Sequence, residues 1–328
     1  MNSEKVNIIF IGGTGRSGTN ITKNLLSLHS NVAALPFEHR FIIDPGGIID
    51  FYNSFSSSWS PYIADKKIKQ LENFLLSLSK KKKLSHFKGS VIKKIDKNGK
   101  KISPNSYHGW ELTKWFPNYE QHVKNLISKL KTFEYSAISP STDSYTSKNK
   151  MYFSPPMSKK DLAPILSTFL NDCFKDLLKK EKKSFFVEDN TWNILFAKEL
   201  FEILPQSYLV HVLRDPRDVI ASLIKQRWCP SEISQVTQYY MAIVNQWFII
   251  KRNIPSSKFI EIKLEDLVKE PKKTLKNICL MTHLPFEESL LNMDLTKSHT
   301  GRWKKDFTEK EQKYVNDTLS EILSKLNY

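Results

Sequence analysis

Two short segments of the chain contain the residue types that proteins use to bind anions. The first, IFIGGTGRSGTNITKNLL at residues 9–26, places glycines beside Arg16, Ser17 and Thr19. A glycine loop between a strand and a helix directs backbone N–H groups at an anion, and the helix dipole adds to the attraction. The loop is too polar for a simple tight turn and is therefore predicted to bind a phosphate-like group.

The spacing of the glycines leaves the identity of that group open. The loop spells G-x-G-x-x-G, and Glu38 follows Gly18 by 20 residues, which is typical of a dinucleotide site. However, Arg16 and Ser17 are bulky for a loop that packs against a pyrophosphate, and Glu38 lies beyond Pro36 rather than at the end of a strand.

Two other ligand classes remain for this loop. An ATP or GTP loop would have Lys-Ser or Lys-Thr where Thr19 and Asn20 stand, so that interpretation is weak. The third option places the cation of Arg16 against a group that gains negative charge during a reaction.

The second segment, YLVHVLRDPRDVIASLI at residues 208–224, predicts a strand followed by a helix. Asp215 can cap the helix and Pro216 suits its first position. Arg214 then stands at the carboxyl end of the strand, where open α/β sheets bind ligands, and Ser222 offers a hydroxyl about two turns later. The alternative to a ligand-binding role for Arg214 is a structural ion pair with Asp215 or Asp218.

Together the two segments resemble the PAPS-dependent sulfotransferases, which use 3′-phosphoadenosine 5′-phosphosulfate (PAPS) as sulfuryl donor, and come closest to the tyrosylprotein, carbohydrate and bacterial branch. The first resembles the family's 5′-phosphosulfate loop and the second its 3′-phosphate element. The segment HTGRWKKDFT at 299–308 is similar to a late Gly-x-Trp segment of the family. The resemblance implies that the nucleotide is bound by Gly15, Arg16, Ser17, Gly18, Thr19, Asn20, Arg214, Ser222 and Arg302.

The general base is less strongly indicated than the nucleotide site. Tyrosylprotein sulfotransferases have a Glu-x-Arg at nearly the offset of Glu38 and Arg40, which implies Glu38 as base and Arg16, Glu38 and Arg40 as catalytic residues. His39 is an adjacent competitor. Many relatives also have Lys-Thr-Pro or Lys-Thr-His where this chain has VEDNTWN at 187–193, so Glu188 and Asp189 are further candidates.

The order of the strands and helices expected around these residues predicts an α/β protein. A strand over 8–11, a helix from Thr19 and a strand over 32–35 form a β-loop-α-β start, and strands are again predicted over 185–187, 208–213 and 259–264. The resemblance implies a P-loop-like three-layer sandwich with a central parallel sheet. We expect one sulfotransferase domain over 1–328, with a variable insertion over 44–160 on the acceptor side.

Charge and composition limit the partners. The net charge is +16, but residues 80–101 hold ten lysines against one acid, a net of +9 that leaves +7 for the rest. Because Arg and aromatic residues are sparse there, a solvated insertion is favoured over a nucleic-acid site.

The three cysteines show no metal or disulfide spacing, and no apolar run is long enough to span a membrane. We therefore expect a cytoplasmic enzyme without a metal.

The sequence thus predicts sulfuryl transfer from PAPS to a hydroxyl-bearing acceptor. The resemblance favours a glycan or other carbohydrate, an anionic glycan among them, and a tyrosine hydroxyl second. The alternatives are an NAD(P)-binding oxidoreductase that uses the G-x-G-x-x-G loop, and a non-catalytic homologue that binds a nucleotide or a polyanion. The oligomeric state is not indicated.

Overall fold

The computed structural model of the protein describes residues 6–39, 41–79, 111–138, 149–295 and 300–328. Internal contacts divide the chain into two compact units, one formed by Met1–Glu38 with Leu178–Tyr328 and the other by His39–Leu177. The predicted insertion over 44–160 falls within the second unit. That the whole chain is a single domain stays a prediction.

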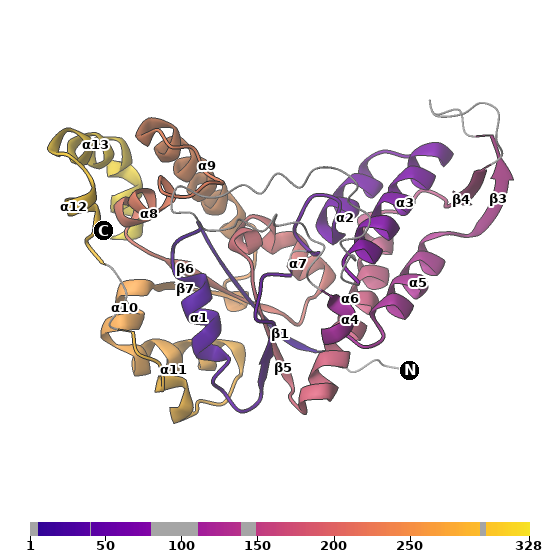
Figure 1. The fold of residues 1–328 in the computed structure, drawn as a ribbon, viewed down its shortest axis with the longest axis horizontal. Helices are drawn as coiled ribbons and strands as arrows, with labels where there is room; N and C mark the ends of the chain where they lie inside the picture. The colour runs from indigo at the N-terminus through magenta and orange to yellow at the C-terminus, as the bar shows by residue number, and fades with distance from the viewer. Residues whose placement is uncertain (1–5, 40, 80–110, 139–148, 296–299) are drawn as a thin grey trace, which may run out of the picture. The chain divides into compact units, whose positions relative to one another are not determined.

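A five-stranded parallel sheet forms the centre of the first unit (Figure 1). In sheet order its strands are β2 (Val32–Ala34), β5 (Phe185–Asp189), β1 (Asn7–Gly13), β6 (Tyr208–Leu213) and β7 (Phe259–Lys263). The chain leaves β1 toward β2 and leaves β6 toward β7, in opposite directions along the sheet. The carboxyl ends of β1 and β6 therefore form the topological switch point at which open α/β sheets bind ligands.

Helices cover both faces of this sheet, as the predicted three-layer α/β class requires. On one face lie α1 (Thr19–Leu26), α10 (Leu264–Lys269) and α11 (Pro271–Thr282), whose apolar side chains share a buried cluster with the strands. On the other lie η2 (Thr191–Phe196), α7 (Ala197–Ile203) and α9 (Ile233–Lys251). There Trp247 of α9 packs edge-on against His211 of β6, at 4.7 Å between ring centres.

A second buried cluster supports the end of the chain. It joins α8 (Pro216–Leu223) and α9 to α12 (Trp303–Asp306) and α13 (Glu309–Leu326). Trp303 is buried in this cluster. The cluster therefore fixes the late Gly-x-Trp segment beside the helix that follows β6. Short 3₁₀ turns, η3 (Ser256–Lys258) and η4 (Glu288–Leu291), complete the unit.

The second unit is mainly helical. It contains α2 (Ile48–Ser57), α3 (Pro61–Ser77), α4 (Leu112–Trp115), α5 (Tyr119–Leu130), most of α6 (Lys159–Glu181) and an antiparallel hairpin of β3 (Phe133–Ala137) and β4 (Asn149–Phe153). The lysine stretch over 80–101 lies outside the described residues.

Candidate active site

The loop between β1 and α1 has the backbone of an anion-binding site. Gly15, Arg16 and Gly18 have positive φ angles of 79°, 58° and 108°. Gly18 caps α1 and no side chain caps the helix, so its first N–H groups face the loop. The Ser17 Oγ is buried and makes no hydrogen bond within the described part of the chain. A tetrahedral anion would supply an acceptor for these donors.

Close packing explains two of the glycines. A Cβ at Gly13 would lie 2.2 Å from Ser17 Oγ and would push that hydroxyl out of the loop. A Cβ at Gly18 would lie 2.8 Å from Leu264, and the backbone there is left-handed as well. The glycines therefore shape the loop around Ser17 rather than serve only as a flexible turn.

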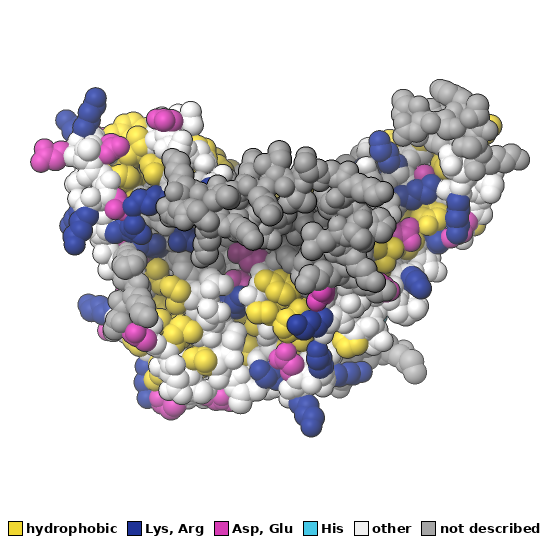
Figure 2. All heavy atoms as spheres, viewed as in Figure 1, with side chains coloured by type: hydrophobic (Ala, Val, Ile, Leu, Met, Phe, Trp, Pro, Cys, Tyr) yellow, Lys and Arg dark blue, Asp and Glu magenta, His cyan; other side chains and the backbone are white. Residues whose placement is uncertain are grey.

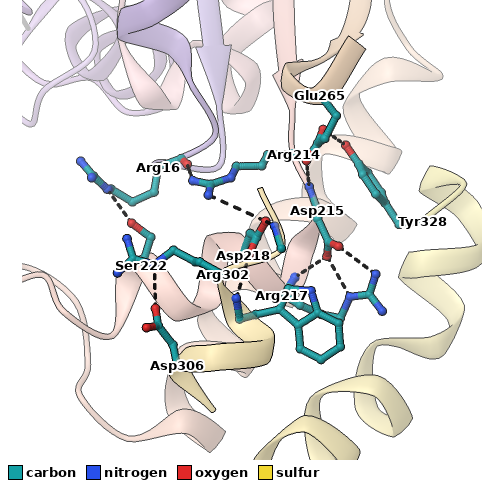
Figure 3. Close-up of polar contacts among 12 residues, drawn as sticks. Arg16, Arg214, Asp215, Arg217, Asp218, Ser222, Glu265, Arg302, Asp306 and Tyr328 are labelled. Atoms are coloured by element: carbon teal, nitrogen blue, oxygen red, sulfur yellow. Dashed lines mark hydrogen bonds and ion pairs between the residues drawn. The ribbon is translucent and has the colours of Figure 1, made fainter. Parts of the chain in front are cut away.

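The two anion-binding segments meet through Arg16 (Figure 3). Arg16 Nε donates to Ser222 Oγ at 3.0 Å, and Arg214 Nη1 donates to the Arg16 carbonyl oxygen at 3.0 Å. The Ser222 hydroxyl accepts in the first bond, so its own proton is free to be donated to a ligand. The structure thus brings three sequence-predicted residues together at the switch point between β1 and β6.

Arg214 is held in place by a buried acid. Its Nη2 lies 3.8 Å from Asp218 Oδ2, one turn later, so the ion pair considered as an alternative is present beside the contact with Arg16. Burial lowers the pKa of Arg214; the carboxylates of Asp218 and Glu265 oppose this, while Arg302 and Arg16 lower the pKa further. The positive charges of Arg16 and Arg302 thus disfavour the charged form of Arg214, an effect that a bound anion would offset.

Arg302 is the third of these cations. Its Nε donates to Asp306 Oδ2 at 2.6 Å, and Lys225 Nζ reaches the same oxygen at 2.8 Å. Arg302 therefore has a surface ion pair, and its positive charge also contributes to lowering the pKa of Arg214. Figure 3 shows its side chain in the same region as Ser222 and Asp218.

Two neighbouring acids lie at the carboxyl end of β5. Asp189 Oδ1 is 3.1 Å from Lys23 Nζ of α1, and both side chains are almost completely buried. Burial raises the pKa of Asp189, against the opposing effects of Lys23 and of a hydrogen bond with Asn20. Asn20 thus connects the loop helix to β5, and Asn24 in turn donates to Asn20 at 3.1 Å.

Glu188 is the second of these acids. Asn193 Nδ2 donates to Glu188 Oε2 at 2.5 Å and to the Ile11 carbonyl oxygen at 2.9 Å. Burial raises the pKa of Glu188 well above its usual range, and the charges of Asp189 and Glu38 raise it further against the Asn193 bond. Glu38 is half-buried and therefore more accessible than Glu188.

The remaining candidates near Glu38 differ in their surroundings. His39 belongs to the second unit, where its buried ring lies 4.5 Å from Phe41 and 6.2 Å from Phe174 between centres. Arg40 lies outside the described residues. The assignment of the base and of all nucleotide-binding residues stays a prediction.

Acidic and cationic candidates both lie at the carboxyl edge of the sheet. Glu188 and Asp189 end β5, and Glu38 follows β2. Arg16 follows β1 and Arg214 follows β6. The carboxylates could accept a proton and the arginines could stabilise an anion. These are the two requirements of a group transfer to a hydroxyl.

Three residues beside the site were not assigned to it from the sequence. Lys23 is the partner of Asp189, and Asp218 was noted only as a possible partner of Arg214. Trp228 is 54% exposed, and a Cβ on Gly15 would lie 3.2 Å from its Cη2. The contacts of Lys23 and Trp228 join distant segments, so spacing along the chain carries no signal for them. Asp218 follows Arg214 by four residues, a spacing that is compatible with their ion pair.

The described residues contain no group of three or more His, Cys, Asp or Glu placed to hold a metal ion. Nor does any helix within the described ranges have the length and apolar character needed to cross a membrane. On the face shown in Figure 2, Lys and Arg side chains are spread over many described elements.

The fold is a parallel α/β sheet with helices on both faces, and the two predicted anion-binding segments meet at its switch point. A model of the sulfotransferase family matches residues 101–288, more than half of the chain, and the chain belongs to that family. The match includes Arg214 and Ser222 and begins after the glycine loop. The predicted family is therefore confirmed.

Solved structures of sulfotransferases are similar over nearly the whole chain. The sulfotransferase domain of the Synechococcus PCC 7002 olefin synthase is 16% identical, with a TM-score of 0.45, over 98% of this chain and 97% of that one. The sulfotransferase domain of the curacin biosynthetic pathway is 15% identical, with a TM-score of 0.49, over 97% and 99%. Sulfotransferase STF1 from Mycobacterium tuberculosis H37Rv is 11% identical, with a TM-score of 0.46, over 97% and 77%. No curated protein sequence matched the chain.

Proposed function

We propose that the protein transfers a sulfuryl group from PAPS to a hydroxyl acceptor, with the nucleotide held at the switch point between β1 and β6. The observation that carries the proposal is the direct connection of the two anion-binding segments, from Arg16 to Ser222 and from Arg214 to the Arg16 carbonyl. Two phosphate-like groups on one nucleotide would suit two such segments. An NAD(P) site gives Arg214 and Ser222 no role.

The loop side would stabilise the leaving group. In the transfer, the bond between sulfur and the bridging phosphate oxygen breaks, and negative charge builds on the 3′,5′-ADP that leaves. Arg16, the N–H groups of the loop and the hydroxyls of Ser17 and Thr19 are the donors proposed for that charge. Arg214, Ser222 and Arg302 would hold the 3′-phosphate.

The carboxylate side would activate the acceptor. We assign the general base to Glu38, which would take the proton of the attacking hydroxyl as the new bond from oxygen to sulfur forms. Glu38 is half-buried, whereas Glu188 is nearly inaccessible and bonded to Asn193. Arg40 would orient Glu38 or the acceptor.

For the acceptor we propose a glycan or other carbohydrate hydroxyl first and a tyrosine hydroxyl second. A net charge of +16 favours an anionic acceptor of either kind over a cationic one. A panel of uncharged sugars, anionic glycans and tyrosine peptides with radiolabelled PAPS would identify the class.

Thermal unfolding with 3′,5′-ADP, NAD, NADP and ATP, each in large excess, tests the nucleotide site. A ligand at about 100 times its dissociation constant adds roughly 2.7 kcal/mol, which moves the midpoint of a chain of this size by a few degrees. We expect a shift with 3′,5′-ADP alone. A shift only with NAD or NADP would contradict the proposal, whereas 3′,5′-ADP binding without transfer to any acceptor would favour a non-catalytic homologue.

A further inference from the structure

One buried carboxylate connects the two parts of the chain that supply cations to the proposed 3′-phosphate site. Asp218 lies in the first turn of α8 and is completely buried. Its Oδ2 accepts the N–H of Gly301 at 2.7 Å, and its Oδ1 accepts the N–H of Trp303 at 3.0 Å (Figure 3). Oδ2 also lies 3.8 Å from Arg214 Nη2. Asp218 therefore contacts both Arg214, which directly follows β6, and the segment 83–85 residues later.

A second contact fastens the same segment to α8. The Arg217 guanidinium lies over the Trp303 ring, 4.4 Å from its centre. Arg217 is itself fixed by Asp215, whose two carboxylate oxygens accept from Nε at 2.9 Å and from Nη2 at 2.8 Å. Because Trp303 is buried, the segment has a defined place on α8 rather than a loose surface contact.

Arg302 is the residue between the two backbone donors that Asp218 fixes. Its backbone cannot shift without breaking a hydrogen bond to Asp218 on one side or the other. Asp218 also lies 3.8 Å from Arg214, and the charge of Arg302 contributes to lowering the pKa of Arg214. The position of one arginine is thus tied to the position of the other.

We infer that Asp218 is a positioning residue that aligns Arg214 and Arg302 on one 3′-phosphate, and so sets the selectivity of the site for nucleotides that carry this group. The inference rests on the proposed function. A carboxylate suits the role because it balances the charge of Arg214 and accepts two backbone N–H groups at once. An amide of the same shape has one acceptor oxygen, and its NH₂ would face a donor.

The test compares the affinities of the full chain for 3′,5′-ADP and for AMP, which differ only in the 3′-phosphate. Isothermal titration gives the two dissociation constants, and the selectivity ratio is the Kd for AMP divided by the Kd for 3′,5′-ADP. For Asp218→Asn we expect this ratio to fall by about tenfold, because the affinity for 3′,5′-ADP decreases while the affinity for AMP stays unchanged. The matched control is Asp266→Asn, because Asp266 occupies the same third helical position in α10 but is exposed.

Each result decides between the inference and its alternatives. An unchanged ratio in Asp218→Asn, or an equal loss for both nucleotides, overturns the positioning role, because a merely structural residue would not affect one phosphate selectively. If Asp218→Asn fails to fold, Arg302→Gln decides: a reduced ratio supports the inference and an unchanged ratio overturns it. Failure of the proposed function is separate, since the unaltered chain would then show no preference for 3′,5′-ADP over AMP.

Discussion

Arg16 and Ser222 are separated by 206 residues in the sequence and are joined by a hydrogen bond of 3.0 Å. The bond unites the loop after β1 with the helix after β6. Since Arg214 also donates to the Arg16 carbonyl oxygen, Arg16 contacts the second segment through both its side chain and its backbone. A ligand that binds one segment is therefore bound within reach of the other.

Replacing Arg16 with alanine should remove transfer and leave the fold intact. The Arg16 side chain is exposed, and its left-handed backbone is no more strained for alanine than for arginine. Loss of one donor to a developing anion lowers kcat by about 10²–10³. Release of 3′,5′-ADP in the presence of an active acceptor measures the effect, with the exposed Arg252→Ala as control. Full activity in Arg16→Ala would contradict the assigned mechanism.

Replacing Glu38 with glutamine should separate catalysis from nucleotide binding. Glutamine keeps the shape of the side chain but cannot accept a proton, so turnover should fall by about 10²–10⁴ while the affinity for 3′,5′-ADP stays unchanged. Rate measurements and isothermal titration give the two quantities, and the exposed Glu309→Gln is the matched control. If Glu38→Gln keeps the turnover rate, and if that rate still falls at low pH as in the unaltered protein, the base lies elsewhere. Glu188 and Asp189 are then the next candidates.

The sequence predicted the elements of the first unit well because local patterns determine them. The strand predicted over 208–213 is β6 (Tyr208–Leu213), and the strand predicted over 185–187 lies within β5 (Phe185–Asp189). Asp215 caps α8 by accepting the Arg217 N–H, as its position before Pro216 predicted. Alternation, capping residues and glycine positions act over a few residues, so they can be recognised without knowing the sheet order.

Contacts between distant segments could not be predicted in the same way. The pairs of Lys23 with Asp189 and of Asp218 with Gly301 depend on which strands are neighbours, and spacing along the chain does not determine this. The helix α6 (Lys159–Glu181) is not among the predicted elements, although its buried residues recur at helical intervals. Pro164 inside this helix weakens the local signal.

The buried pair of Lys23 and Asp189 should matter for stability as a pair. Lys23→Met leaves the Asp189 carboxylate buried without its cation, which costs about 3–5 kcal/mol of unfolding free energy near neutral pH. The double variant Lys23→Met/Asp189→Leu should regain much of this loss, because neither charge is then buried. Urea unfolding of both variants measures the difference. Equal loss in the single and double variants would mean that packing, and not the charge, determines the cost.

Glu188→Gln should stabilise the protein in a pH-dependent way. Because burial raises the pKa of Glu188, the folded state keeps a proton that the unfolded state releases above about pH 4.5. Stability is thus greatest below that pH and falls as the pH rises toward the pKa in the folded state. Glutamine mimics the protonated form, so thermal unfolding should show a higher midpoint at pH 8 and little change at pH 4.5. Glu288→Gln, which alters an exposed side chain, should show no such trend. If Glu188→Gln instead destabilises the protein at pH 8, then Glu188 is ionised in the folded state and is a competent alternative to Glu38 as the base.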